Sequence, residues 1–498
     1  LADDLGWTDL GCQGSKYYET PNIDRLAASG LRFTSHYHSQ NCAPTRACLM
    51  TGQYAPRTGV YTVGTLERGL AKDRKMVVPE NVVNLPLDRR TVADALKGGG
   101  YVTGIFGKWH LGQKGDYHPG KRGFDEAITT MGKHFDFVTQ PPVDYPKGIY
   151  LADWLTDRAV DFIERHKNEP FFLYVSHFGV HSPFHAKKEL IARFQKKAPV
   201  GEHRDPVYAA MIASIDESVG RILAKLDELN LAEDTIVIFA SDNGGVGGYA
   251  EIGGRGVTSN APLRGGKGML YEGGVRVPFI VRWPRRTKGG SVCHEPTAHV
   301  DIFPTFLDMA GVKERPKQPL DGVSLVPLLS EPAAKLPREA IYAHFPGYLE
   351  GYATKQWRTA PVGFIRAGDW KLMEFYEDGR LELYNLKDDL GEKNNLAAKM
   401  PEKARELRGK LAAWRQELKA AMPRLRVEGD PPGKDTKKGK KTGALSSQPL
   451  AAERWDLALL GLPWDCEATA LERSDSVPYD EGVGLSWRTP RWPILSRP

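Results

Sequence analysis

Residues 235–245 read TIVIFASDNGG, a short apolar run that ends in two polar side chains, Asp242 and Asn243. The length of this run and its β-branched residues predict a strand that is buried on both faces of a sheet. Three other runs have the same character, namely YVTGIFG (101–107), FFLYVSHF (171–178) and VPFIVRW (277–283). We therefore expect a sheet whose strands lie in the interior of the protein.

Helical segments separate these runs. Residues 150–166, YLADWLTDRAVDFIERH, repeat apolar side chains at helical spacing. Asp205 and Pro206 offer an N-cap and a first-turn proline for a second long helix, and shorter helices should follow Thr20 and Thr91. Because strands and helices alternate, we predict an α/β fold with a mostly parallel or mixed central sheet that is sandwiched by helices.

The last third of the chain has a different pattern. Residues 363–386 alternate around GD and DG turns, as an antiparallel sheet does, and residues 400–422 form a charged amphipathic helix. From about Arg426 the chain becomes rich in Pro, Gly and Lys. We therefore expect a main domain over 1–335, a smaller antiparallel-sheet plus helix subdomain over 336–425, and a disordered linker and tail over 426–498.

Composition excludes several classes of protein. The 498 residues are 41% hydrophobic and 26% charged, as in ordinary globular domains, and the apolar runs are too short to cross a bilayer. The net charge of +6 comes without a basic face interleaved with aromatics, so we expect neither nucleic acid nor a membrane as a partner. Five irregularly spaced cysteines indicate neither a disulfide scaffold nor a zinc site.

Polar residues stand at the ends of the buried runs. They are Asp3 and Asp4 near the start of the chain, then Lys108 and His110, then His181, then Asp242 and Asn243. The carboxyl ends of parallel strands meet at one edge of a sheet, where ligands bind. We therefore expect these side chains to form one site.

The acidic members of this set suit a metal ion. Asp3, Asp4, Asp242 and Asn243 offer hard oxygen donors, and clustered carboxylates repel one another unless a cation lies among them. Oxygen ligands favour Ca²⁺ or Mg²⁺ over zinc.

The stretch SQNCAPTRACLMTG (39–52) adds an anion site. If a helix begins near Cys42, then Cys42 and Arg46 share one face, and the helix N-terminus attracts a tetrahedral anion. Arg46, Lys108, His110 and Lys267 would add positive charge. These residues predict a site for a phosphate-like or sulfate-like ester beside a divalent cation, and they leave the role of Cys42 open.

At this point a family resemblance becomes clear. CAPTR followed by ACLMTG resembles the C-x-P-x-R signature of the type I sulfatases, which belong to the alkaline-phosphatase-like superfamily. The segments ADDLGW, TPNIDRLAASG, GKWHLG, HSPF, SDNGG and GGKGMLYEGGVRVP fit the same family in order, over residues 1 to roughly 415. The resemblance implies an arylsulfatase-like sulfuric ester hydrolase that acts on a sulfated carbohydrate or an aryl sulfate.

The resemblance also implies roles for single residues. Cys42 would be oxidised after translation to formylglycine, an aldehyde whose hydrate attacks sulfur and then expels sulfate. Its oxygen would join Asp3, Asp4, Asp242 and Asn243 around a Ca²⁺ ion, in preference to Mg²⁺. Arg46 would hold the hydrate, Lys108 and Lys267 would stabilise the sulfate oxygens, His181 would protonate the leaving alcohol, and His110 would take the proton of the second hydroxyl.

Two other functions and one other acid stay open. The same fold could hydrolyse phosphate or phosphonate esters, and a chain whose Cys42 stays a thiol could be an inactive binder of sulfated glycans. His177, four residues before His181, could compete for the role of the acid.

The resemblance implies a partner and a compartment as well. The partner would be a formylglycine-generating enzyme or an anaerobic sulfatase-maturating enzyme, and the compartment would be the periplasm or the cell exterior, although no signal peptide is present in this sequence. We interpret LADDLGW as a truncated start that leaves Asp3 and Asp4 with little scaffold, and we expect lower stability or weaker metal binding as a result.

Overall fold

The computed structural model describes residues 1–254, 256–351, 356–430, 433 and 435. The chain divides into two units, Leu1–Ala451 and Ala452–Pro498, and every described residue belongs to the first. Most of the expected linker and tail, 426–498, lies outside the described residues.

Two sheets form the centre of the described unit. The first has the order β5-β4-β3-β6, and the second has the order β10-β1-β8-β7 with β9 also beside β1. Their bounds are β1 Leu31–Tyr37, β3 Val102–Gly107, β4 Glu126–Thr130, β5 Thr139–Gln140, β6 Phe171–Ser176, β7 Val237–Ala240, β8 Arg276–Arg282, β9 Ser291–Cys293 and β10 Thr297–Ala298.

The strand directions are mixed. β4, β3 and β6 are parallel, as are β1, β9 and β10, whereas β8 runs antiparallel to both β1 and β7. β1 and β7 therefore point the same way. The predicted mostly parallel or mixed α/β arrangement is confirmed.

The first two residues, Leu1 and Ala2, form a segment that connects the two sheets. The amino group of Leu1 donates to the carbonyl of Val175 at 2.8 Å, and the N–H of His177 donates to the carbonyl of Leu1 at 3.0 Å. On the other side, Ala2 forms a parallel bridge with Ser241, next to the end of β7. Leu1 and Ala2 therefore give the Asp3–Asp4 pair backbone support on both sides, and the expected lower stability or weaker metal binding stays a prediction.

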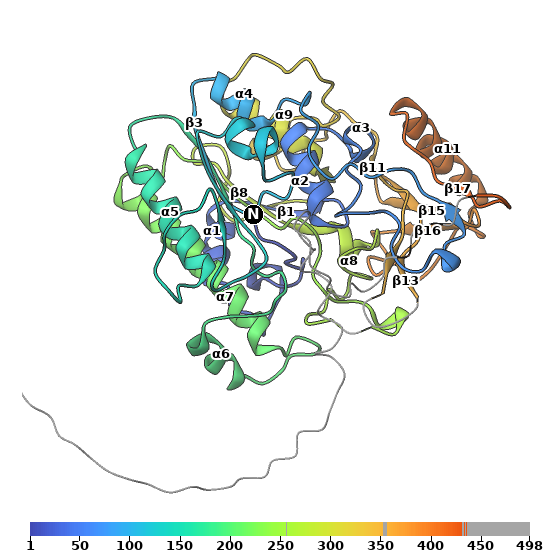
Figure 1. Ribbon diagram of the computed structural model, residues 1–498, viewed down its shortest axis with the longest axis horizontal. Helices are drawn as coiled ribbons and strands as arrows, with labels where there is room; N and C mark the ends of the chain where they lie inside the picture. The colour runs from blue at the N-terminus through green and yellow to red at the C-terminus, as the bar shows by residue number, and fades with distance from the viewer. Residues whose placement is uncertain (255, 352–355, 431–432, 434, 436–498) are drawn as a thin grey trace, which may run out of the picture. The chain divides into compact units, whose positions relative to one another are not determined.

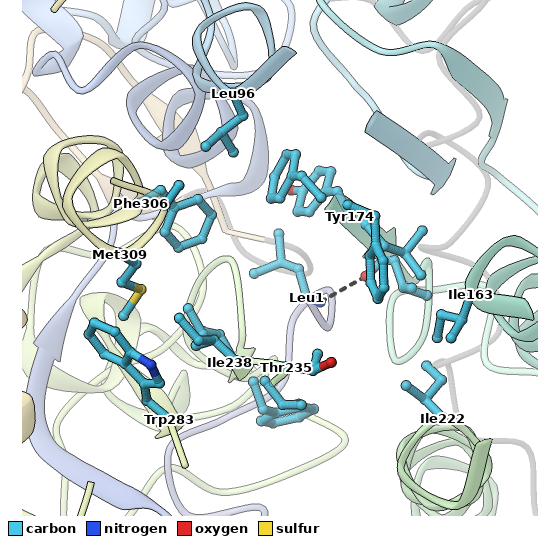
Figure 2. A pocket seen from close by; sticks show the side chains of 18 of the residues that line it. Leu1, Leu96, Ile163, Tyr174, Ile222, Thr235, Ile238, Trp283, Phe306 and Met309 are labelled. Atoms are coloured by element: carbon cyan, nitrogen blue, oxygen red, sulfur yellow. Dashed lines mark hydrogen bonds between the residues drawn. The ribbon is translucent and has the colours of Figure 1, made fainter. Parts of the chain in front are cut away.

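Behind this segment lies an apolar cavity of about 630 Å³ between β6 and β7. Figure 2 shows Leu1 in the middle of the cavity, with Leu96 and Phe306 on one side and Ile163 and Ile222 on the other. The cavity therefore surrounds Leu1, the first residue of this segment, and helices from both faces of the sheet line it.

Helices cover both faces of the central strands. Figure 1 shows α1, α5, α6 and α7 on one side and α2, α4 and α9 on the other. The helices are α1 Pro21–Ser29, α2 Cys42–Thr51, α3 Ala55–Thr58, α4 Val92–Gly98, α5 Leu151–Arg165, α6 Lys188–Gln195, α7 Pro206–Glu228, α8 Glu272–Val275, α9 Ile302–Met309, α10 Val326–Ser330 and α11 Pro401–Glu417. All four helices predicted in the first half are present, and the carboxylate of Asp205 accepts the N–H groups of Val207 and Tyr208 as the predicted N-cap of α7.

The C-terminal part forms its own antiparallel sheet. Its order is β11-β14-β15-β16, and α11 packs against it. The bounds of the remaining strands are β2 Met76–Val77, β11 Ile341–Phe345, β12 Leu349–Glu350, β13 Trp357–Thr359, β14 Val362–Ala367, β15 Trp370–Phe375, β16 Leu381–Asn385 and β17 Arg424–Leu425. β17 pairs with β2, so the end of this part returns to the first half of the chain.

Neither disulfides nor membrane helices occur in the part of the chain that the structure describes. Its four cysteines, Cys12, Cys42, Cys48 and Cys293, are all free. None of its helices combines the length and the apolar character that crossing a bilayer requires.

Candidate active site

The helix predicted near Cys42 begins at that residue. β1 ends at Tyr37, a short loop follows, and Cys42 is the first residue of α2, after Asn41 in extended conformation. Arg46 lies one turn further along, and both side chains are 1% exposed. Because α2 carries no acidic residue in its first turn, its N-terminus keeps its affinity for an anion.

Arg46 connects three parts of the site. Its Nε and Nη2 donate to one oxygen of Asp242, and its Nη1 donates to the carbonyl of Lys108 at 2.6 Å and to the hydroxyl of Ser176 at 2.5 Å. The hydroxyl of Ser176 in turn donates to the same carbonyl of Lys108 at 2.7 Å. The sequence interpretation missed Ser176, although it ends a predicted strand as the recognised residues do.

The four predicted oxygen donors converge. Donor atoms of Asp3, Cys42 and Asp242 all lie within 4.8 Å of one another, and the carboxylates of Asp3 and Asp4 form a similar group with His181. The amide nitrogen of Asn243 donates to Asp4 at 2.9 Å, which leaves its carbonyl oxygen to face elsewhere.

Two of these donors have buried oxygens without a hydrogen-bond partner in the described chain, Oδ1 of Asp3 and Oδ1 of Asn243. A buried oxygen normally finds a partner, and hard oxygens in a cluster are the ligands of Ca²⁺ or Mg²⁺. The residues present therefore fit a divalent cation.

Charge pairs divide the two adjacent carboxylates. Lys108 pairs with Asp3, and Nζ of Lys267 lies 2.6 Å from Oδ2 of Asp4. Burial and the nearby Asp242 raise the pKa of Asp3 well above its usual value. Burial alone would raise the pKa of Asp4 too, but Lys267 and the other nearby cations lower it. A divalent cation would relieve the crowding that raises the pKa of Asp3.

His181 is held in one tautomer. Its Nδ1–H donates to the carbonyl of Ser182 at 2.5 Å, so Nε2 is the nitrogen that exchanges a proton, and Nε2 lies 3.7 Å from Oδ2 of Asp4. Burial and Lys267 lower the pKa of His181 well below its usual value. An anion bound beside the ring would favour the protonated form again.

His110 follows β3 in a conformation that is uncommon outside glycine. Its φ is 63°, and the φ of Asp4 is 65°. Nδ1 of His110 is buried and has no hydrogen-bond partner among the described residues, and Lys108 and His181 are close enough to influence its charge. Such strain at two predicted site residues is typical of functional positions.

His177, the other candidate for the acid, and two further histidines, His36 and His38, make structural contacts. Nε2 of His177 hydrogen-bonds the hydroxyl of Ser218 in α7 at 3.1 Å. His36 and His38 contact each other through Nε2 at 2.9 Å, and His36 also bonds Thr297. These contacts support structural roles, so His181 is the better candidate for an acid than His177.

All ten predicted site residues therefore meet at one edge of the central sheets. Asp3 and Asp4 follow the connecting segment, and the others follow β1, β3, β6 and β7, except for Lys267, which lies in the loop between β7 and α8. The site combines a cation position, a buried Cys42 at a helix N-terminus, three fixed cations and two histidines. This arrangement can bind a tetrahedral anion and exchange protons beside it.

Sequence comparison identifies similar proteins. The family profile described as Sulfatase matches residues 1–312, and that described as N-sulphoglucosamine sulphohydrolase, C-terminal, matches residues 266–419. The chain is 35% identical to a sulfatase of Formosa agariphila, over 83% of this chain and 87% of that protein. It is 36% identical to the human N-acetylgalactosamine-6-sulfatase, over 66% of this chain and 64% of that protein.

Solved structures agree with the sequence comparison. The crystal structure of Ps i-CgsB in complex with k-i-k-neocarrahexaose superposes with a TM-score of 0.70 and 29% sequence identity. The match covers 83% of this chain and 91% of that one.

Proposed function

The chain belongs to the sulfatase family of sulfuric ester hydrolases, and from this premise we propose that it uses a formylglycine made from Cys42 to release sulfate from a sulfated sugar. The observation that carries the proposal is the position of Cys42. It is buried at the N-terminus of α2, with donor atoms of two carboxylates within 4.8 Å. A soft sulfur is a poor ligand for the hard cation that these carboxylates would hold, whereas an oxygen in its place would suit that cation.

The proposed metal is Ca²⁺, held by Asp3, Asp4, Asp242 and Asn243. The unpartnered oxygens of Asp3 and Asn243 support this assignment, and Ca²⁺ accepts the irregular sets of oxygen ligands that Mg²⁺ tolerates less well. When bound, the ion supplies positive charge that favours an ionised oxygen at residue 42.

The proposed nucleophile needs two hydroxyls on one carbon. A hydrated formylglycine supplies one hydroxyl to attack sulfur and a second whose deprotonation expels sulfate. Arg46 is fixed by its contacts to Asp242 and to the backbone of Lys108, and its charge is close enough to interact with residue 42. His110, with its unpartnered Nδ1, is the proposed acceptor for the proton of the second hydroxyl.

The remaining cations act on the substrate. Lys108 and Lys267 now pair with Asp3 and Asp4, and a sulfate group would share these charges. His181 donates the proton of Nε2 to the leaving oxygen as the bond to sulfur breaks. The negative charge of a bound sulfate would counteract the burial and the charge of Lys267, which lower the pKa of His181.

The names of the relatives support a sugar as the leaving alcohol. They are an N-acetylgalactosamine-6-sulfatase and Ps i-CgsB, whose crystal structure holds k-i-k-neocarrahexaose. We assign the chemistry to the proposed catalytic domain, 1–335, with 336–425 as a supporting subdomain. By analogy with the family, we also propose maturation by a formylglycine-generating or anaerobic maturating enzyme and work in the periplasm or outside the cell.

Comparative turnover tests the proposal. The matured protein should hydrolyse 4-nitrophenyl sulfate and members of a panel of defined sulfated sugars, and 4-nitrophenyl phosphate and phenylphosphonate esters far more slowly. Cys42→Ala should abolish turnover, whereas Cys48→Ala, which changes another buried cysteine of α2, should keep it. Faster turnover of the phosphorus esters would assign the chain to phosphoester or phosphonate hydrolysis, and no turnover by matured protein would favour a binding role.

A further inference from the structure

His134 lies directly behind His181. It follows the carboxyl end of β4, its side chain is buried, and its Nε2–H donates to the carbonyl of His181 at 2.8 Å. Its own carbonyl accepts the N–H of Leu151, the first residue of α5. His134 therefore links the loop that carries His181 to the start of a long helix of the scaffold.

A ring contact connects the same residues. The ring centroid of His134 lies 5.0 Å from that of Phe178, and the ring of Phe178 lies 4.9 Å from that of His181. Nζ of Lys108 lies 5.5 Å from the centre of the Phe178 ring. Phe178 is thus packed between His134 and the two proposed catalytic groups.

These contacts restrict His181 in three ways. The hydrogen bond from His134 fixes the backbone of His181, the tilted ring contact with Phe178 restricts the rotation of its ring, and the carbonyl of Ser182 fixes the proton on Nδ1. What remains is a single direction for Nε2, towards Asp4. A proton donor must lie within hydrogen-bond reach of the atom it protonates, so its direction matters for catalysis.

We propose that His134 is a positioning residue that holds His181 in the direction needed to protonate the leaving alcohol. This inference rests on the proposed role of His181 as the acid. In that step the N–H bond at Nε2 breaks, its electron pair stays on the ring, and the proton goes to the bridging oxygen as that oxygen takes the electron pair of its bond to sulfur.

The leaving group reveals whether this step is impaired. A basic leaving oxygen needs the proton as it departs, whereas a nitrophenolate departs with little help. Misdirection of His181 should therefore slow esters of basic alcohols much more than esters of acidic phenols. A general loss of structure would slow all esters by the same factor.

The experiment measures kcat/KM for a series of aryl sulfates from 4-nitrophenyl to 4-methoxyphenyl sulfate. His134→Phe keeps a ring against Phe178 but loses the donor, and His134→Gln keeps an N–H donor in a similar place. We expect His134→Phe to lose about threefold on 4-nitrophenyl sulfate and on the order of 10²-fold on 4-methoxyphenyl sulfate. His134→Gln should recover most of the kcat/KM that His134→Phe loses on 4-methoxyphenyl sulfate. His181→Ala should show a still stronger dependence of kcat/KM on the leaving group.

Two results overturn the inference, and they are distinguishable. If His181→Ala depends on the leaving group but His134→Phe loses the same factor on every ester, His134 does not position the acid. If His181→Ala itself shows no dependence, the acid is another group, and the proposed role of His181 fails as well. If circular dichroism shows that His134→Phe does not fold, Phe178→Leu, which removes the ring contact to His181, takes its place. Its kcat/KM should then fall more on 4-methoxyphenyl sulfate than on 4-nitrophenyl sulfate, and equal losses on both would overturn the inference.

Discussion

Arg46 donates from two of its nitrogens to a single oxygen of Asp242, Nε at 3.1 Å and Nη2 at 2.8 Å, and both side chains are buried. The pair joins the second turn of α2 to the loop after β7, two elements that are distant in the sequence. A buried pair of this kind is strongly destabilised when one partner is removed, because the other charge is left uncompensated. It therefore fixes the distance between the proposed nucleophile and the proposed metal ligands.

Replacement of Arg46 by Lys should impair catalysis severely. Lysine keeps the charge but cannot reach Asp242, Ser176 and the backbone of Lys108 together, because it lacks the planar fork of arginine. We expect kcat for 4-nitrophenyl sulfate to fall by about 10²–10³-fold. Arg57→Lys, which alters an ion pair with Asp321 outside the site, should stay within a few fold; equal losses in the two variants would contradict this account of Arg46.

Replacement of Asn243 should weaken metal binding. The buried Oδ1 of Asn243 has no hydrogen-bond partner in the described chain, so we expect it to ligate the ion. Asn243→Ala should raise the Kd for Ca²⁺, measured by calorimetry on protein stripped with EGTA, by at least roughly tenfold. Asn385→Ala in the C-terminal sheet serves as the control, and an unchanged Ca²⁺ affinity in Asn243→Ala would remove this residue from the site.

The stability of the protein should fall as the pH rises through 7, because of Glu392. Nζ of Lys371 lies between Glu272 and Glu392, at 2.9 and 2.8 Å, and all three side chains are buried. Burial raises the pKa of Glu392 to about 7. Lys371 lowers this pKa, but its effect is smaller than the combined effect of burial and the negative charge of Glu272. The folded state therefore retains a proton that the unfolded chain loses near pH 4.5.

The proton on Glu392 determines how the free energy of unfolding depends on pH. Its contribution to stability is complete below pH 4.5, is lost as the pH rises through 7, and amounts to a few kcal/mol. Between pH 5.5 and 8 the Tm of Glu392→Gln should therefore fall less than that of the unaltered protein, whereas exposed Glu402→Gln should change nothing. Parallel pH profiles for Glu392→Gln and the unaltered protein would show that Glu392 does not titrate in this range.

An apolar extension before Leu1 should stabilise the protein. Alternate backbone groups of a strand face opposite sides, so β6 and β7 direct N–H and C=O groups into the cavity that Leu1 enters. An added segment of roughly five β-branched residues could pair with both strands and fill this space. We expect Tm to rise by about 5 °C or more and Ca²⁺ to bind more tightly.

The matched control for this extension carries proline at two of the added positions, which removes the N–H donors without shortening the segment. Equal thermal midpoints and equal Ca²⁺ affinities for the two extended proteins and the original one would contradict the prediction. They would also contradict the hypothesis, drawn from the sequence, that support before Asp3 limits stability.

The sequence predicts the strands that carry the site because each is a continuous apolar run followed by a polar residue. The run 277–283 shows the limit of this signal, because apolar character carries no direction, and β8 proves antiparallel to its neighbours. His134 was missed because β4, EAITT, is too polar to stand out as a buried strand. A search for polar residues after β4, like the search after the other strands, would have found His134.

Contacts between distant residues could not be predicted at all. The ion pair of Lys371 with Glu272 joins residues 99 positions apart, and nothing in either local sequence selects the partner. The support for Asp3 and Asp4 was likewise invisible, because it comes from the backbone of β6 and of the residue after β7, not from a side-chain pattern.

The mass of the peptide that contains Cys42, measured on protein whose sulfatase activity has been quantified, tests the central claim most directly. The account predicts that activity rises in proportion to the fraction of this peptide whose thiol group has been replaced by an aldehyde. A preparation in which residue 42 is entirely unmodified cysteine and which still hydrolyses sulfate esters at the full rate would contradict it.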